Sequence, residues 1–193
     1  MAVRWVEVLQ DAGIPDGVVN LVIGGGEDVG NAIVDHPDVA LISFTGSTDT
    51  GVALAARAAA LNKRVSLEMG GKNAVIVLDD ANLDLAVDGI LWSAFGTSGQ
   101  RCTAASRVIV QRGAQKELVD RLVARAGGMR LGDGLDETVQ VGPVVSKGQL
   151  ETISGYVEIG KQEGARLATG GGIATEGALG HGFFHEPTIF DNV

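Results

Sequence analysis

The clearest indication of the fold is the segment Val39-Ala-Leu-Ile-Ser-Phe-Thr-Gly-Ser-Thr-Asp-Thr-Gly51. Its first part is apolar, which predicts a strand over residues 39–45. Gly46 ends that run, and the alanine-rich, proline-free segment 47–61 predicts a helix with Ser47 as its N-cap. A strand that turns through glycine into a helix is the repeating unit of an α/β protein.

The same alternation continues on both sides of this stretch. Apolar or β-branched runs bounded by glycine, proline or polar residues predict strands at residues 18–23, 64–68, 73–78, 106–111 and 188–190. Helical spacing predicts helices at residues 3–12, 82–95, 116–126 and 146–162, and a short glycine-led helix at 24–36. We therefore expect an α/β fold.

Composition excludes several classes of function. The chain has 193 residues, enough for one large or two modest domains, and no apolar run approaches the roughly 18 to 20 residues that cross a bilayer. The first residues lack the layout of a signal peptide, so we expect a soluble, cytoplasmic protein that does not bind membranes. The net charge of -9 argues against nucleic acid as a partner.

Metal and disulfide chemistry are not expected either. The single cysteine cannot form an internal disulfide, and the three histidines lack the spacing of a zinc site: His36, His181 and His185. We therefore expect no metal. Cys102 is either a buried residue that packs in the core or a residue that takes part in a reaction.

The turn Phe44–Gly51 is the first candidate site. A helix that starts just after glycine exposes unpaired N–H groups and the positive end of its dipole, which suits a phosphate. The alternative is a purely structural cap. A P-loop does not fit, because Asn31 and Val52 stand where lysine is required, and no GxGxxG motif occurs.

The second candidate is the motif Leu67–Lys72, which places Glu68 at the end of an apolar strand before two glycines. A partly desolvated carboxylate at such a strand end is suited to act as a general base. The alternative is a surface ion pair between Glu68 and Lys72.

The third candidate is Cys102, which follows the polar, glycine-containing turn 96–101. A lone cysteine is commonly a small buried apolar residue. Exposure on a turn and the neighbouring Arg101 instead favour the reactive thiolate.

These three motifs in this order resemble the aldehyde dehydrogenase family. They are the turn Phe44–Gly51, the motif Leu67–Lys72, and Gly-Gln-Arg-Cys at 99–102. The resemblance covers essentially the whole chain, from Ala-Gly-Ile-Pro at 12–15 to Glu-Pro-Thr at 186–188. It implies a Rossmann-like cofactor domain, of which residues 1–98 are the second half, followed by the first part of an α/β catalytic domain at 99–193.

The resemblance also implies a reaction and its residues. Cys102 attacks the aldehyde carbonyl, the resulting thiohemiacetal gives up a hydride to NAD or NADP, and Glu68 activates the water that hydrolyses the thioester. The N–H of Cys102 is an oxyanion donor. Gly46 and Ser47 face the cofactor pyrophosphate, Gly26 faces the adenine side, and the Met69 backbone faces the nicotinamide carboxamide.

This sequence departs from the family pattern at several points. Met69 replaces a usual leucine and Asp49 a frequent glutamate, both mild changes. Members of the family are much longer, and the upstream oxyanion asparagine, the upstream ribose-binding lysine and the downstream Glu-x-Phe-Gly-Pro stretch have no counterpart here. We therefore expect a partial chain with exposed edges that associates as a homo-oligomer.

Two alternatives follow from that expectation. The fragment is either catalytically incompetent, serving only as a structural or interaction remnant, or retains esterase activity through Cys102. The substrate is a small aldehyde, and a semialdehyde is one option because Arg101 lies next to the nucleophile. The other option for Arg101 is a solvated or packing side chain.

Overall fold

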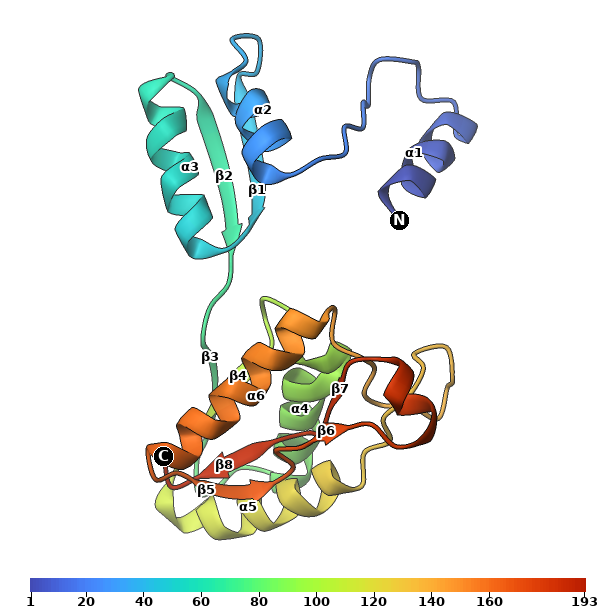
Figure 1. Ribbon diagram of the computed structural model, residues 1–193. Helices are drawn as coiled ribbons and strands as arrows, with labels where there is room; N and C mark the ends of the chain where they lie inside the picture. Colours follow the sequence, from blue (N-terminus) through green and yellow to red (C-terminus); the bar gives the residue numbers. More distant parts are fainter. The chain divides into compact units, whose positions relative to one another are not determined.

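A computed structural model describes residues 1–193 and divides them into two compact units, Met1–Gly70 and Gly71–Val193 (Figure 1). Both units mix helices and strands, which confirms the expected α/β class. The division lies earlier than the expected boundary at 98/99, because the segment after Gly71 pairs and packs with the residues that follow it. A functional boundary at 98/99 stays a prediction.

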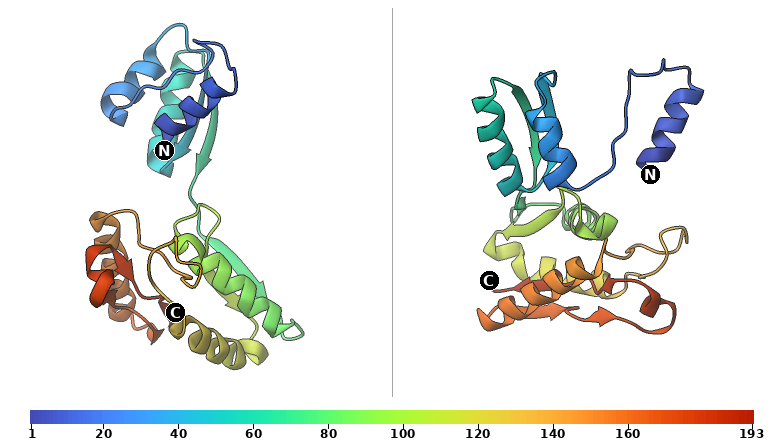
Figure 2. Two further views of the ribbon diagram at one scale, coloured as in Figure 1. Left: turned by 90° about the vertical axis from the view of Figure 1, so that its right-hand side faces the viewer. Right: turned by 45° about the horizontal axis from the view of Figure 1, so that its top comes forward.

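The first unit is built on a parallel strand–helix–strand motif. Strand β1 (Leu41–Gly46), helix α3 (Thr48–Ala60) and strand β2 (Arg64–Met69) follow one another along the chain. The strands pair in parallel from Leu41 opposite Arg64 to Gly46 opposite Met69. Helix α3 packs along this pair, as Figures 1 and 2 show. The small core consists of Val34, Ile42 and Ala58.

The segment before β1 contains helix α1 (Ala2–Asp11), a π-helical turn (Gly26–Gly30) and the short helix α2 (Asn31–Asp35). The helix expected at 3–12 is confirmed. The strand expected at 18–23 is wrong, because those residues are exposed and no strand of the chain pairs with them. A β-branched run becomes a strand only when a neighbour accepts its backbone hydrogen bonds.

The second unit begins with strand β3 (Asn73–Val77), helix α4 (Leu83–Phe95), a 3₁₀ turn (Gly96–Gly99), strand β4 (Ala105–Val110) and helix α5 (Arg112–Gly127). Strands β3 and β4 are parallel. The core of this unit lies between them and the two long helices: Val77, Val87, Ile90, Leu91, Leu118, Leu122 and Ala126.

The rest of the second unit carries helix α6 and short antiparallel strands. Helix α6 (Lys147–Gln162) is followed by β5 (Arg166–Thr169), β6 (Ile173–Ala174), a 3₁₀ turn (Gly177–His181), β7 (Phe184–His185) and β8 (Ile189–Asp191). Strand β5 pairs with β8, and β6 pairs with β7. None of the helices in the structure has the length and apolar character that a membrane crossing requires.

Candidate active site

In the first unit, four of the predicted site residues meet where two parallel strands end. Gly46 ends β1 opposite Met69, which ends β2, and Glu68 lies one residue earlier, opposite Thr45. Ser47 follows Gly46 and begins the turn into α3. The carboxyl ends of parallel strands are where α/β proteins bind ligands, because the helices that follow begin there.

The start of α3 has the donors that an anion needs. Ser47 Oγ accepts from Thr50 N at 3.3 Å, which confirms the expected N-cap, and donates to Thr50 Oγ1 at 2.8 Å. The N–H groups of Thr48 and Asp49, in the first turn, have no acceptor inside the helix. Together with the helix dipole, they can hold a negatively charged group such as a phosphate.

Two side chains pack tightly beneath this turn. A Cβ at Gly46 would overlap the ring of Phe44, and a Cβ at Gly51 would lie 2.5 Å from Sδ of Met69. Glycine is therefore required at both positions for this packing. Met69 uses its side chain against α3, which leaves its backbone at the strand end.

Gly26 lies apart from these four residues, at the start of the π-helical turn. It is exposed, and no atom would lie within 4 Å of an added Cβ. The structure thus contains no contact that requires glycine there, and its role near adenine stays a prediction.

Glu68 is exposed within the first unit and forms no ion pair there. The partial desolvation expected from the sequence is not present in this unit. Lys72, in the second unit, lies with its Nζ 6.0 Å from the centroid of the Tyr156 ring. The alternative Glu68–Lys72 pair would join the two units and stays a hypothesis.

Cys102 belongs to the second unit, and its side chain is exposed. Exposure argues against the packing alternative, because an inert structural thiol is usually buried. The residue follows a turn of unusual hand, in which Thr97, Ser98 and Gly99 have φ values of 53°, 55° and 67°. Left-handed backbone at two successive non-glycine residues is costly and needs support from outside the turn.

Two hydrogen bonds from a distant segment supply that support. Ser98 Oγ donates to the carbonyl oxygen of Gly142 at 2.8 Å, and Gln100 Oε1 accepts from Val145 N at 3.0 Å. These hydrogen bonds therefore hold the turn before Cys102 against residues 142–145.

Arg101 packs on α4. Its guanidinium lies 3.9 Å from the centroid of the Trp92 ring, and Nη2 donates to the Trp92 carbonyl oxygen at 3.1 Å. This contact corresponds to the packing option for Arg101. Sequence reasoning did not identify Trp92 as its partner.

Asn73 is the contact of Cys102 that sequence reasoning missed. Its side-chain amide donates to the carbonyl oxygen of Cys102 at 2.8 Å. The only available signal was its place directly after the motif Leu67–Lys72, and that motif does not reveal a partner 29 residues away.

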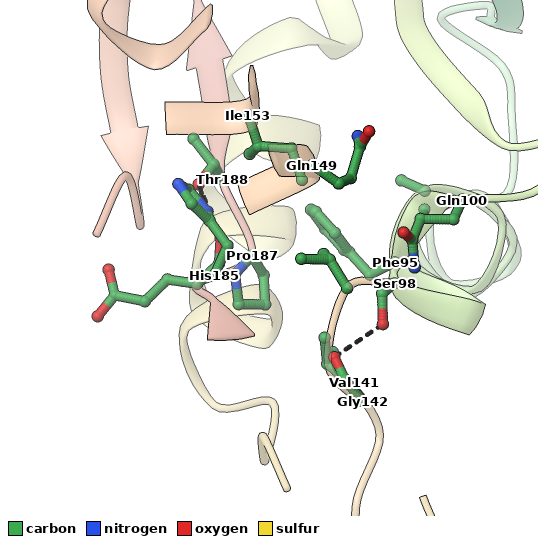
Figure 3. A pocket seen from close by; sticks show the side chains of 14 residues that line it. Phe95, Ser98, Gln100, Val141, Gly142, Gln149, Ile153, His185, Pro187 and Thr188 are labelled. Atoms are coloured by element: carbon green, nitrogen blue, oxygen red, sulfur yellow. Dashed lines mark hydrogen bonds between the residues drawn. The ribbon is translucent and has the colours of Figure 1, made fainter. Parts of the chain in front are cut away.

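A cavity of about 280 Å³ is lined in part by residues of the turn (Figure 3). Its walls include Phe95, Ser98, Gln149 and Pro187, and the Ser98–Gly142 hydrogen bond is drawn there. Cys102 is not among its lining residues, so the cavity is not the space in front of the thiol. No three His, Cys, Asp or Glu side chains are grouped so that they could hold a metal ion.

Comparison with known proteins identifies the family. The model of the aldehyde dehydrogenase family matches residues 1–193. The chain belongs to this family. A member from Halalkalibacterium halodurans, 1-pyrroline-5-carboxylate dehydrogenase 1, is 48% identical over 98% of the chain and 37% of its own length. The α-ketoglutaric semialdehyde dehydrogenase of Bacillus subtilis is 44% identical over 98% of the chain and 39% of its own length.

A solved aldehyde dehydrogenase structure has the same fold. The betaine aldehyde dehydrogenase of Staphylococcus aureus, in complex with NAD+, superposes with a TM-score of 0.95 at 37% identity. The match covers 100% of this chain and 38% of that one. The chain thus spans less than two fifths of the length of the aldehyde dehydrogenases that it matches.

Proposed function

We propose that this chain is the part of an NAD(P)-dependent aldehyde dehydrogenase that carries the nucleophile and the general base, and that the whole protein oxidises an aldehyde to a carboxylic acid. The observation that carries the proposal is Cys102, an exposed thiol on a backbone that is hydrogen-bonded on both sides. The relatives are dehydrogenases by name, which favours an enzyme over a structural remnant.

Cys102 is the nucleophile in this proposal. Its thiolate attacks the carbonyl carbon of the aldehyde, a carbon–sulfur bond forms, and the carbonyl oxygen becomes an oxyanion. The N–H of Cys102 donates to no acceptor within the structure, so it is available to stabilise that oxyanion. The product of this step is a thiohemiacetal.

The cofactor, when bound, supplies the hydride acceptor that converts the thiohemiacetal to a thioester. The residues present fit a dinucleotide, because the free N–H groups at the start of α3 suit its pyrophosphate. Gly46 and Ser47 would hold the pyrophosphate, Met69 would face the carboxamide through its backbone, and Gly26 would lie on the adenine side. NAD is favoured by the NAD+ complex of the S. aureus relative, and NADP stays an alternative.

Glu68 is the general base. It accepts a proton from water while the water oxygen bonds to the acyl carbon of the thioester. The carbon–sulfur bond then breaks, the carboxylic acid leaves, and the Cys102 thiolate is restored. The exposed position of Glu68 at the strand end is compatible with access to water.

The substrate is a small aldehyde, and we propose a semialdehyde as the first class to test because one relative is a semialdehyde dehydrogenase by name. We further propose a homo-oligomer. Strands β1 and β2, and likewise β3 and β4, form two-stranded sheets whose outer edges are unpaired, and exposed Trp92 and Ile76 add apolar surface, which either the rest of the protein or a second copy must cover. Light scattering of the intact protein measures the assembly, and a monomer would refute it.

The experiment measures NAD(P)H formation from an aldehyde panel by the intact protein and two variants. Cys102→Ala should abolish both dehydrogenase and esterase activity. Glu68→Gln should give a rapid burst of a single NAD(P)H per site followed by slow turnover, because the thioester forms but hydrolyses slowly. Normal turnover by Cys102→Ala sinks the proposal, and an unchanged steady state in Glu68→Gln removes Glu68 from it.

A further inference from the structure

One side chain binds two carbonyl groups, that of Cys102 itself and that of Ala104, two residues later. Asn73 Nδ2 donates to the carbonyl oxygen of Cys102 at 2.8 Å and to that of Ala104 at 3.1 Å. Both hydrogens of the amide are thus used, and both go to the short segment between the left-handed turn and strand β4 (Ala105–Val110).

The β3–β4 pair is irregular at the end where Asn73 lies. Asn73 pairs with Ala105, but Ala74 already pairs with Arg107, so Ser106 is an extra residue on β4. Such a bulge leaves the extra residue unpaired and disrupts the ladder locally. The Asn73 amide binds the carbonyl groups of the segment just before β4, and Ser106 Oγ donates a hydrogen bond to the Asn73 carbonyl oxygen at 3.3 Å.

The bonds restrain both peptide units that meet at the Cys102 Cα. The preceding unit is restrained because the Arg101 carbonyl oxygen accepts from Ala104 N at 3.0 Å. The following unit is restrained because the Cys102 carbonyl oxygen accepts from Asn73. The thiol is therefore exposed on a backbone that is restrained on both sides, and the Ala104 bond restrains the peptide unit that carries the N–H of Cys102.

We infer that Asn73 is a positioning residue for Cys102, restraining the backbone at its Cα, and so the direction of its thiol, through the carbonyl group of the same residue. The inference rests on the proposed function, in which that thiol attacks the aldehyde. Asn73 does not touch the reacting atoms. Displacement of a reacting group by about 1 Å lowers rates by about 100-fold, so loss of the Asn73 amide should act mainly on kcat.

The other end of the same strand pair offers a matched control. Gln111 follows β4, and its side-chain Oε1 accepts from Asp79 N at 2.8 Å, while its backbone N donates to Val77 O at 2.9 Å. An amide side chain therefore stabilises each end of the β3–β4 pair. If Asn73 only stabilises the end of the β3–β4 pair, removing its amide and removing that of Gln111 will have the same effect on activity per folded molecule.

The experiment compares Asn73→Ala, Asn73→Asp and Gln111→Ala in the intact protein, with kcat expressed per thiol titrated by an alkylating reagent. Asn73→Ala should lower kcat by about 10- to 100-fold with KM within about twofold, whereas Gln111→Ala should keep kcat within about twofold. Asn73→Asp should lose at least as much as Asn73→Ala, because a carboxylate has no hydrogen to donate.

A second readout needs no cofactor. The rate of alkylation of Cys102 by iodoacetamide as a function of pH should change in Asn73→Ala and not in Gln111→Ala, because only the former releases the cysteine backbone. If Asn73→Ala does not fold, Asn73→Ser, which retains one donor, is judged by the same two comparisons. Equal kcat and equal alkylation profiles in the Asn73 and Gln111 variants would overturn the inference. Activity in Cys102→Ala would instead overturn the proposed function.

Discussion

Ser98 is the position where the energetic cost of the left-handed turn can be measured directly. Its φ of 55° costs an L-residue other than glycine about 1 to 2 kcal/mol. Its Oγ donates to the Gly142 carbonyl oxygen at 2.8 Å, and a bond of this kind stabilises a fold by about 0.5 to 1.5 kcal/mol. Two substitutions separate these contributions, because both remove the hydroxyl and only one removes the backbone strain.

Ser98→Ala loses the hydrogen bond and keeps the strain, so its free energy of unfolding should fall by about 1 kcal/mol. Ser98→Gly loses the same bond but is relieved of about 1 to 2 kcal/mol of strain. Against that relief stands the greater freedom of glycine in the unfolded chain, about 0.4 to 1 kcal/mol. The glycine variant should therefore be more stable than the alanine variant by about 0.5 to 1 kcal/mol.

The opposite order holds at an ordinary helical position. Ala124 is exposed in the interior of α5, and Ala124→Gly should cost about 1 kcal/mol. Urea unfolding of the three variants and the parent protein measures all the differences on one scale. A Ser98→Gly variant that is less stable than Ser98→Ala would refute the left-handed turn and the strain assigned to it.

Three further predictions concern the second unit and are checked by urea unfolding. Gly113→Ala should lower stability by about 1 kcal/mol, because its Cβ would lie 2.7 Å from the Asp79 carboxylate that caps α5, and Asp79→Ala should add little to that loss. The Arg166 guanidinium holds the pKa of Asp191 below its usual value, so the ionised Asp191 carboxylate stabilises the fold at neutral pH, and this stabilisation is lost as pH falls below about 4. The loss of unfolding free energy in Asp191→Asn should therefore become smaller over that pH range. Leu118→Ala should cost about 2 to 5 kcal/mol, because Leu118 is only 1% exposed.

The first unit shows what sequence can predict. Ser47 was identifiable as an N-cap because a polar residue between glycine and an alanine-rich run is a local signal that needs no tertiary partner. The carboxylate at the end of β2 was found for the same reason. The strand at 18–23 was wrong because a β-branched run carries no information about whether another strand lies beside it.

The second unit shows what sequence could not predict. The polar, glycine-containing segment 96–101 predicted a turn, but Thr97 and Ser98 have no preference for left-handed backbone, so nothing in the sequence indicated its hand. Asn73 was missed because its bonds reach 29 and 31 residues along the chain to carbonyl groups that every residue possesses. Contacts of this kind follow from the register of the sheet and not from residue type.

The attachment of the left-handed turn to residues 142–145 also bears on biosynthesis. Ser98 leaves the ribosome 44 residues before Gly142, which at about 5 to 20 residues per second is a delay of about 2 to 9 s. During that interval Cys102 follows a turn whose partners at residues 142–145 have not yet been synthesised. The backbone before Cys102 can therefore reach its final geometry only after translation has passed residue 145. Cys102 is synthesised early, but its surroundings are completed late.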